Sequence, residues 1–217
     1  GGSLIRPEAT GFGVVYFAEE MLKTKGASFD GKNVAVSGFG NVAWGAVQKV
    51  NELGGNVVTL SGPDGFIYDP EGVKGEKVDY MLELRDSNND VVEDYAKKFG
   101  VEFFEGKRPW EIKVDVALPC ATQNEILEED ARKLIENECM CVCEGANMPT
   151  SIEAYKMFSE SNILYAPGKA SNAGGVATSG LEMSQNSMRL PWSKEEVDHR
   201  LHEIMKRIHD TCISTAD

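Results

Sequence analysis

Residues 33–43 read Asn-Val-Ala-Val-Ser-Gly-Phe-Gly-Asn-Val-Ala, an apolar strand that leads directly into a G-x-G-x-x-A motif. Gly38 permits a tight turn, and Gly40 has no Cβ, so the backbone there can come close to a pyrophosphate. Ala43 is small enough for the following helix, expected over 42–53, to pack against the strand. The N-terminus of that helix offers unpaired N–H groups to the phosphates. This order of strand, glycine turn and helix favours dinucleotide binding over an ordinary glycine-rich turn.

Four further segments collect small and polar residues where a predicted strand ends. They are 61–64 (Ser-Gly-Pro-Asp), 119–124 (Pro-Cys-Ala-Thr-Gln-Asn), 144–149 (Glu-Gly-Ala-Asn-Met-Pro) and 166–175 (Ala-Pro-Gly-Lys-Ala-Ser-Asn-Ala-Gly-Gly). Each segment alone is compatible with ordinary turn chemistry. Together they favour a ligand site, because ligands of open α/β sheets bind beyond the carboxyl ends of the strands.

Strand and helix patterns alternate along the chain, which predicts a largely parallel sheet with helices on both faces. The expected strands are 34–37, 57–60, 66–68, 101–104, 114–118, 139–143 and 163–166. The expected helices are 8–24, 42–53, 78–84, 91–99, 128–136, 172–186 and 195–208. The sequence shows no internal repeat or linker, so we predict one α/β, Rossmann-like, doubly wound domain over residues 1–217.

The composition restricts the partners. The chain has 35 acidic and 22 basic residues and a net charge of −13, which argues against nucleic acid and against an anionic membrane surface. No apolar run approaches the roughly 18 residues of a membrane span, and no signal peptide is recognisable. Five cysteines, an odd number, indicate reduced thiols and a cytoplasmic protein. The chain opens on Gly-Gly-Ser and stops within a helical pattern, so we expect a piece of a longer protein.

Two sets of potential metal ligands have a simpler interpretation. The first set is three alternating cysteines of one predicted strand, Cys139, Cys141 and Cys143. All three would point to one face of the sheet, and their spacing favours buried strand thiols over a zinc site. The second set is three histidines of the last predicted helix, His199, His202 and His209. We expect them on a solvated helix face and predict no metal site.

Four runs in this chain are long and distinctive. They are 2–11 (Gly-Ser-Leu-Ile-Arg-Pro-Glu-Ala-Thr-Gly), 119–124, 144–149 and 172–186 (Asn-Ala-Gly-Gly-Val-Ala-Thr-Ser-Gly-Leu-Glu-Met-Ser-Gln-Asn). In these runs the chain resembles glutamate dehydrogenases of the small-subunit hexameric type, and the resemblance covers essentially its whole length. It implies a reversible oxidative deamination of L-glutamate to 2-oxoglutarate and ammonia, with NAD or NADP as cofactor and a homohexameric parent protein.

The resemblance also implies roles for individual residues. Those expected at the pyrophosphate are Gly38, Phe39, Gly40, Asn41 and Val42. Those expected on the adenosine-ribose side are Cys120, Ala121 and Thr122. Those expected at the nicotinamide are Asn147 beside its ribose, and Thr10 and Asn172 at its carboxamide. Those expected at the substrate are Val176, Ser179, which donates to the side-chain carboxylate, and Arg6, near the cleft.

The resemblance further implies that the catalytic residues lie elsewhere. In this family a preceding domain supplies the lysines that bind the substrate and activate water, and an aspartate that moves protons. Residues 1–217 do not contain that domain. We therefore expect no catalytic residue here, and we expect the isolated chain to be an inactive binding module of an enzyme.

The coenzyme preference depends on the end of the second strand, where an acid binds the ribose 2′-OH and a basic residue accommodates a 2′-phosphate. Here Ser61 is followed by Asp64, the loop has no Lys or Arg, and Arg85 on the next helix is the nearest basic candidate. The segment resembles NAD-using relatives more than NADP-using ones, which have Ser-Asp-Ser. NAD is the favoured cofactor, and dual use stays open.

Two alternatives also stay open. A dehydrogenase of leucine, valine or phenylalanine shares this fold and chemistry, although Ser179 favours glutamate over an apolar side chain. A nucleotide-binding regulatory module without catalysis would carry the same glycine motif. The sequence that precedes residue 1 distinguishes an enzyme from such a module.

Overall fold

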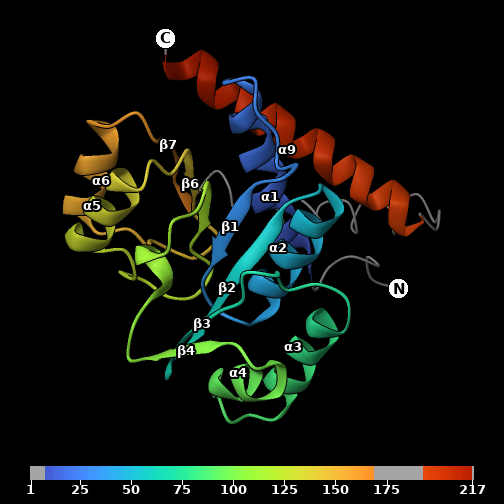
Figure 1. Cartoon of the computed structure of the whole chain (residues 1–217). Helices are drawn as coiled ribbons and strands as arrows, with labels where there is room; N and C mark the ends of the chain where they lie inside the picture. Colours follow the sequence, from blue (N-terminus) through green and yellow to red (C-terminus); the bar gives the residue numbers. More distant parts are fainter. Residues whose placement is uncertain (1–7, 169–192, 217) are drawn as a thin grey trace.

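A seven-stranded sheet runs through the residues that the computed structural model describes, 8–168 and 193–216 (Figure 1). In spatial order its strands are β4 (Glu102–Glu105), β3 (Gly65–Tyr68), β2 (Asn56–Gly62), β1 (Asn33–Val36), β5 (Val116–Leu118), β6 (Cys141–Cys143) and β7 (Leu164–Ala166). Neighbours from β2 to β7 pair in parallel, and β3 and β4 add an antiparallel edge. The chain leaves β1 to one side toward β2, and β5 lies on the other side, so the strand order reverses at β1.

Two apolar clusters cover opposite faces of this sheet. Val34 and Val36 belong to the first cluster and Ala35 to the second, as expected for side chains that alternate along a strand. The first cluster includes residues of α1 (Ala9–Lys23), α2 (Asn41–Glu52), α3 (Glu76–Asp86), α4 (Glu93–Phe99) and α9 (Lys194–Ala216). The second includes residues of the 3₁₀ turn η2 (Pro109–Glu111), α5 (Glu128–Glu136) and α6 (Ile152–Ser159). The predicted doubly wound α/β class is confirmed.

The predicted strands all exist, but three helical features differ from the prediction. Helix α6 and turn η2 were not predicted, and α9 continues eight residues beyond Ile208. In α6, the apolar side chains of Ile152 and Tyr155 are exposed while Phe158 is buried. Apolar residues therefore do not mark the buried face of this helix in the sequence. The predicted helix 172–186 lies outside the described residues. Among the helices of the described residues, none has the length and apolar character needed to cross a membrane.

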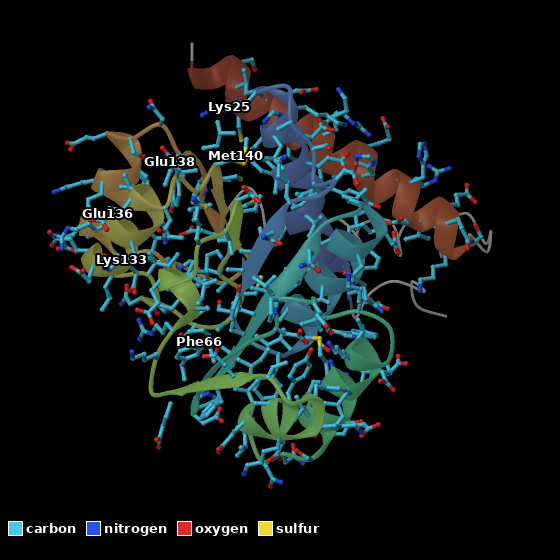
Figure 2. All side chains as sticks on the ribbon, viewed as in Figure 1. Lys25, Phe66, Lys133, Glu136, Glu138 and Met140 are labelled. Atoms are coloured by element: carbon cyan, nitrogen blue, oxygen red, sulfur yellow. The ribbon has the colours of Figure 1, made fainter. Side chains whose placement is uncertain are left out.

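The three alternating cysteines do not share one face of the sheet, so that prediction is wrong. Strand β6 begins at Cys141; Cys141 and Cys143 pack in the first cluster, whereas Cys139 packs in the second. The cause is the turn between α5 and β6, where Figure 2 labels Glu138. This residue has a φ of 58°, and the Cys139 N–H donates to the Leu134 carbonyl. The three thiols are buried as expected, and burial raises the pKa of Cys139 to about 12.

The histidines of α9 do not all face solvent, which corrects the second expectation. His199 is exposed, but His209 is buried and meets Phe17 edge-on, with ring centroids 5.2 Å apart. The ring of His202 stacks on Tyr16 at 4.2 Å. One face of α9 therefore packs on α1, across which the helix runs (Figure 1).

A buried lysine anchors α9 to α2. Lys49 of α2 is 2% exposed, and its Nζ lies 2.9 Å from Oδ2 of Asp198 and 2.6 Å from Oε2 of Glu52. The Tyr16 hydroxyl donates to Oδ1 of Asp198 at 2.7 Å. Burial, and then the Asp198 carboxylate, raise the pKa of Tyr16 well above its usual range. The Asp198 carboxylate therefore joins three helices.

We predict that Asp198→Ala destabilises the protein by about 2 kcal/mol, because it removes one of the two carboxylates that pair with the buried Lys49 ammonium. Urea denaturation measures the loss in the free energy of unfolding. Glu196→Ala, which removes an exposed pair with Arg200 on the same helix, is the matched control and should leave the midpoint of urea denaturation unchanged. Equal stability of the two variants would contradict this account.

Candidate functional site

A cavity of about 570 Å³ opens where β1, β2 and β5 end. Its walls come from the segments that follow these strands, and from positions near the ends of α3 and β4. The lining residues are 38–40, 61–63, 65, 85, 90, 106–108, 120–122 and 125. The cavity thus lies at the point where the strand order reverses, the position at which doubly wound sheets bind ligands.

The two motif glycines serve this cavity in different ways. Gly38 has a φ of 84°, and a Cβ at this position would lie 3.1 Å from the Cys120 carbonyl oxygen. Gly40 precedes α2, and apart from its two chain neighbours no residue has an atom within 4 Å of the place where its Cβ would be. In the described structure no side chain caps the start of α2, so its first N–H groups stay available to an anion.

Hydroxyl groups connect the three strand ends. The Gly38 N–H donates to Oγ of Ser61 at 2.8 Å, which links the β1 turn to β2. The Cys120 N–H donates to Oγ of Ser37 at 2.9 Å, which links the β5 loop to β1. Ser61, predicted beside the adenosine ribose, therefore lines the cavity and also supports the glycine turn.

Glu125 is a lining residue that sequence reasoning missed. Its side chain is almost fully buried, and Oε2 accepts from the N–H groups of Ala121 at 3.0 Å and Thr122 at 2.8 Å. Burial raises its pKa, and these hydrogen bonds oppose the rise. The only signal in the sequence is a lone Glu directly after the polar run 119–124.

The charged residues that line the cavity differ from the expected ones. Both carboxylate oxygens of Asp64 accept backbone N–H groups at the start of α4, from Val92 and Glu93, each at 3.0 Å. Asp64 is consequently absent from the lining of the cavity, while Asp90 and Arg85 belong to it. Oδ1 of Asp64 nevertheless lies 2.9 Å from the place of a Cβ on the lining residue Gly62, so its ribose contact stays a prediction.

Arg85 is held beside the glycine turn. Its guanidinium donates to the side-chain oxygen of Asn41 and lies 5.7 Å from the centre of the Trp44 ring. Asn41, predicted at the pyrophosphate, therefore positions a cation at the mouth of the cavity. Lys107 and Arg108 add two more positive charges to the lining.

The remaining predicted site residues fall into two groups. Those that the structure describes away from the lining of this cavity are Thr10 in the first turn of α1, Val42 in α2, and Asn147 after β6. Those that lie outside the described residues are Arg6, Asn172, Val176 and Ser179. The cavity thus brings together the residues predicted for the pyrophosphate turn and the adenosine side, namely Gly38, Phe39, Gly40, Ser61, Cys120, Ala121 and Thr122.

Comparison with known proteins decides the family. A model of the Glutamate/Leucine/Phenylalanine/Valine dehydrogenase family matches residues 1–217. The chain belongs to this family. The NAD-specific glutamate dehydrogenase of Bacteroides fragilis is 64% identical over 214 residues, which are 98% of this chain and 48% of that protein. The NADP-specific glutamate dehydrogenase of Escherichia coli is 54% identical over 213 residues, again 98% of this chain and 48% of that protein.

The fold agrees with solved members of the family. The glutamate dehydrogenase of Plasmodium falciparum superposes with a TM-score of 0.95 at 42% identity, and the match covers 100% of this chain and 46% of that one. The chain therefore spans about half the length of the Glutamate/Leucine/Phenylalanine/Valine dehydrogenases that it matches.

We predict that Gly38→Ala costs about 1–2 kcal/mol of stability, because an L-residue resists the left-handed backbone. Its Cβ would also press on the Cys120 carbonyl. Gly40→Ala is the matched control, two residues away with an ordinary φ and open space at the Cβ. It should cost less than Gly38→Ala, only the difference between Gly and Ala as the N-cap of α2. Urea denaturation compares the two variants, and equal midpoints would show that Gly38 is not constrained.

Proposed function

We propose that residues 1–217 form the coenzyme-binding domain of a glutamate dehydrogenase. The full-length protein catalyses the reversible oxidative deamination of L-glutamate to 2-oxoglutarate and ammonia, with NAD or NADP as cofactor. The observation that carries this proposal is the cavity at the reversal of strand order, with an uncapped helix end and open space at Gly40. The 64% identity to an NAD-specific glutamate dehydrogenase supports the substrate.

The lining of the cavity fits a dinucleotide. The pyrophosphate lies at the start of α2, where the N–H groups and the helix dipole favour an anion. Arg85, Lys107 and Arg108 add positive charge around it. The adenosine half extends toward Ser61 and Thr122. When bound, the nicotinamide accepts a hydride, and the role of this domain is to hold and orient it.

The substrate end is proposed from the family resemblance. The residues that contact the substrate or border its cleft are Val176, Ser179 and Arg6, with Ser179 donating to the side-chain carboxylate. The residues that orient the nicotinamide are Thr10, Asn147 and Asn172. The rest of the full-length protein supplies the catalytic lysines and aspartate, so this domain alone does not turn over glutamate. The full-length protein acts as a cytoplasmic homohexamer.

The position of the acidic groups supports NAD over NADP. Asp90 lines the cavity, and its carbonyl oxygen lies 3.5 Å from the place of a Cβ on Gly62, at the end of β2. A carboxylate at this edge accepts a hydrogen bond from a ribose 2′-OH and repels a 2′-phosphate. The Asp64 carboxylate lies nearer, with Oδ1 2.9 Å from the same place, but both of its oxygens already accept N–H groups of α4, so we assign the ribose to Asp90.

We predict that the full-length protein oxidises L-glutamate with NAD and that Gly40→Val abolishes this by blocking coenzyme binding. The new side chain fits the unliganded protein, because apart from its two chain neighbours no residue has an atom within 4 Å of its Cβ. NADH fluorescence titration should show a dissociation constant raised at least a hundredfold, while thermal stability is kept. A folded Gly40→Val variant that binds NADH as tightly as the wild type would refute the phosphate site.

We predict that Asp90→Asn lowers the ratio of kcat/KM with NAD to kcat/KM with NADP roughly two- to fivefold, since a solvated charge pair is worth about 0.5–1 kcal/mol. Asp86→Asn, an exposed acid at the end of α3, is the matched control and should not change the ratio. Asp64→Ser should cost about 1 kcal/mol of stability as a lost cap and keep the ratio. A ratio that follows Asp64 instead of Asp90 would reverse the assignment.

A further inference from the structure

The Glu125 carboxylate is an expensive group to bury in the wall of a cavity. Its side chain is 2% exposed, and transfer of a carboxylate out of water is costly unless hydrogen bonds replace the hydration. An apolar residue would pack at this place without that cost. The question is therefore what the carboxylate does that an apolar side chain cannot do.

Its first function is to fix the loop after β5. The single oxygen Oε2 accepts from two successive N–H groups, those of Ala121 and Thr122. The guanidinium of Arg108 holds the other side of this loop, since it donates to the carbonyl oxygens of Asn124 at 3.0 Å and Glu125 at 2.8 Å. The loop segment 120–122 cannot rotate its peptides without breaking these bonds.

Its second function is to connect that loop to the glycine turn. The Ser37 hydroxyl lies beside the Glu125 carboxylate and lowers its pKa, and its Oγ accepts from the Cys120 N–H. Ser37 directly precedes Gly38, whose lack of a Cβ lets the Cys120 carbonyl come close. One carboxylate thus holds both the β5 loop and the turn that starts α2.

We propose that Glu125 is a positioning residue for the adenosine half of the coenzyme. It holds the walls formed by 38–40 and 120–122 at the separation that the dinucleotide requires, and it acts through Ser37, Ala121 and Thr122. This inference rests on the proposed function, because it assumes that the cavity binds the coenzyme.

The test uses the full-length protein, with NADH as the probe. In Glu125→Ala the dissociation constant of NADH, measured by fluorescence titration, should rise at least tenfold. The KM for glutamate and kcat at saturating NAD should stay within twofold, because the substrate end is untouched. In Glu125→Gln the amide oxygen can replace Oε2, so binding should recover to within threefold of the wild type. Glu129→Ala, an exposed acid of α5, is the matched control.

The outcomes separate the inference from the function on which it rests. A wild type that does not bind NADH overturns both. Unchanged NADH affinity in a folded Glu125→Ala overturns the inference alone, as does failure of Glu125→Gln to recover binding. If Glu125→Ala does not fold, Ser37→Ala removes the same link with a smaller change. It should raise the dissociation constant at least threefold, and an unchanged value would also overturn the inference.

Discussion

The hydrogen bond from the Gly38 N–H to the Ser61 hydroxyl is the interaction around which the site is arranged. Beside this bond the backbone of Gly38 has a left-handed conformation, which turns the chain from β1 into α2 within a few residues. The same conformation lets the Cys120 carbonyl approach from β5. Three strand ends therefore meet at one peptide, and the open N-terminus of α2 faces the space that they enclose.

The cavity differs in charge from the chain as a whole. A net charge of −13 repels an anionic ligand at long range. In the lining of the cavity three basic side chains, Arg85, Lys107 and Arg108, stand against two acidic ones, Asp90 and Glu125. The N–H groups at the start of α2 add to the positive side. The Asp64 carboxylate, which would add negative charge at the rim, caps α4 instead. Binding of an anion here depends on groups within a few ångströms, which salt screens less than the distant charges.

The parts of the site that could be predicted from the sequence are those in which the backbone forms the wall of the cavity. The glycine turn and the segments 61–64 and 120–122 could be placed because they follow strand ends, and strand ends are visible as apolar runs. The cap that Asp64 forms was not predicted, because its partners, Val92 and Glu93, lie 28 and 29 residues further along the chain. Glu125 was missed because no local pattern indicates that a single Glu in a polar loop will be buried. The face of the sheet predicted for Cys139 was wrong for a similar reason, because the turn at Glu138 sets the side on which this residue packs.

The attachment of α9 to α2 has a mechanical consequence. Helix α9 has 23 residues, and at a rise of about 1.5 Å per residue it is roughly 35 Å long. Asp198, near one end of this rod, is tied to Lys49, which belongs to the same helix whose first turn faces the cavity. Further along, His202 stacks on Tyr16 and His209 meets Phe17, so α9 is also held on α1 at two points beyond Asp198. The long helix therefore restrains α1 and α2 relative to each other, on the side of α2 away from its first turn.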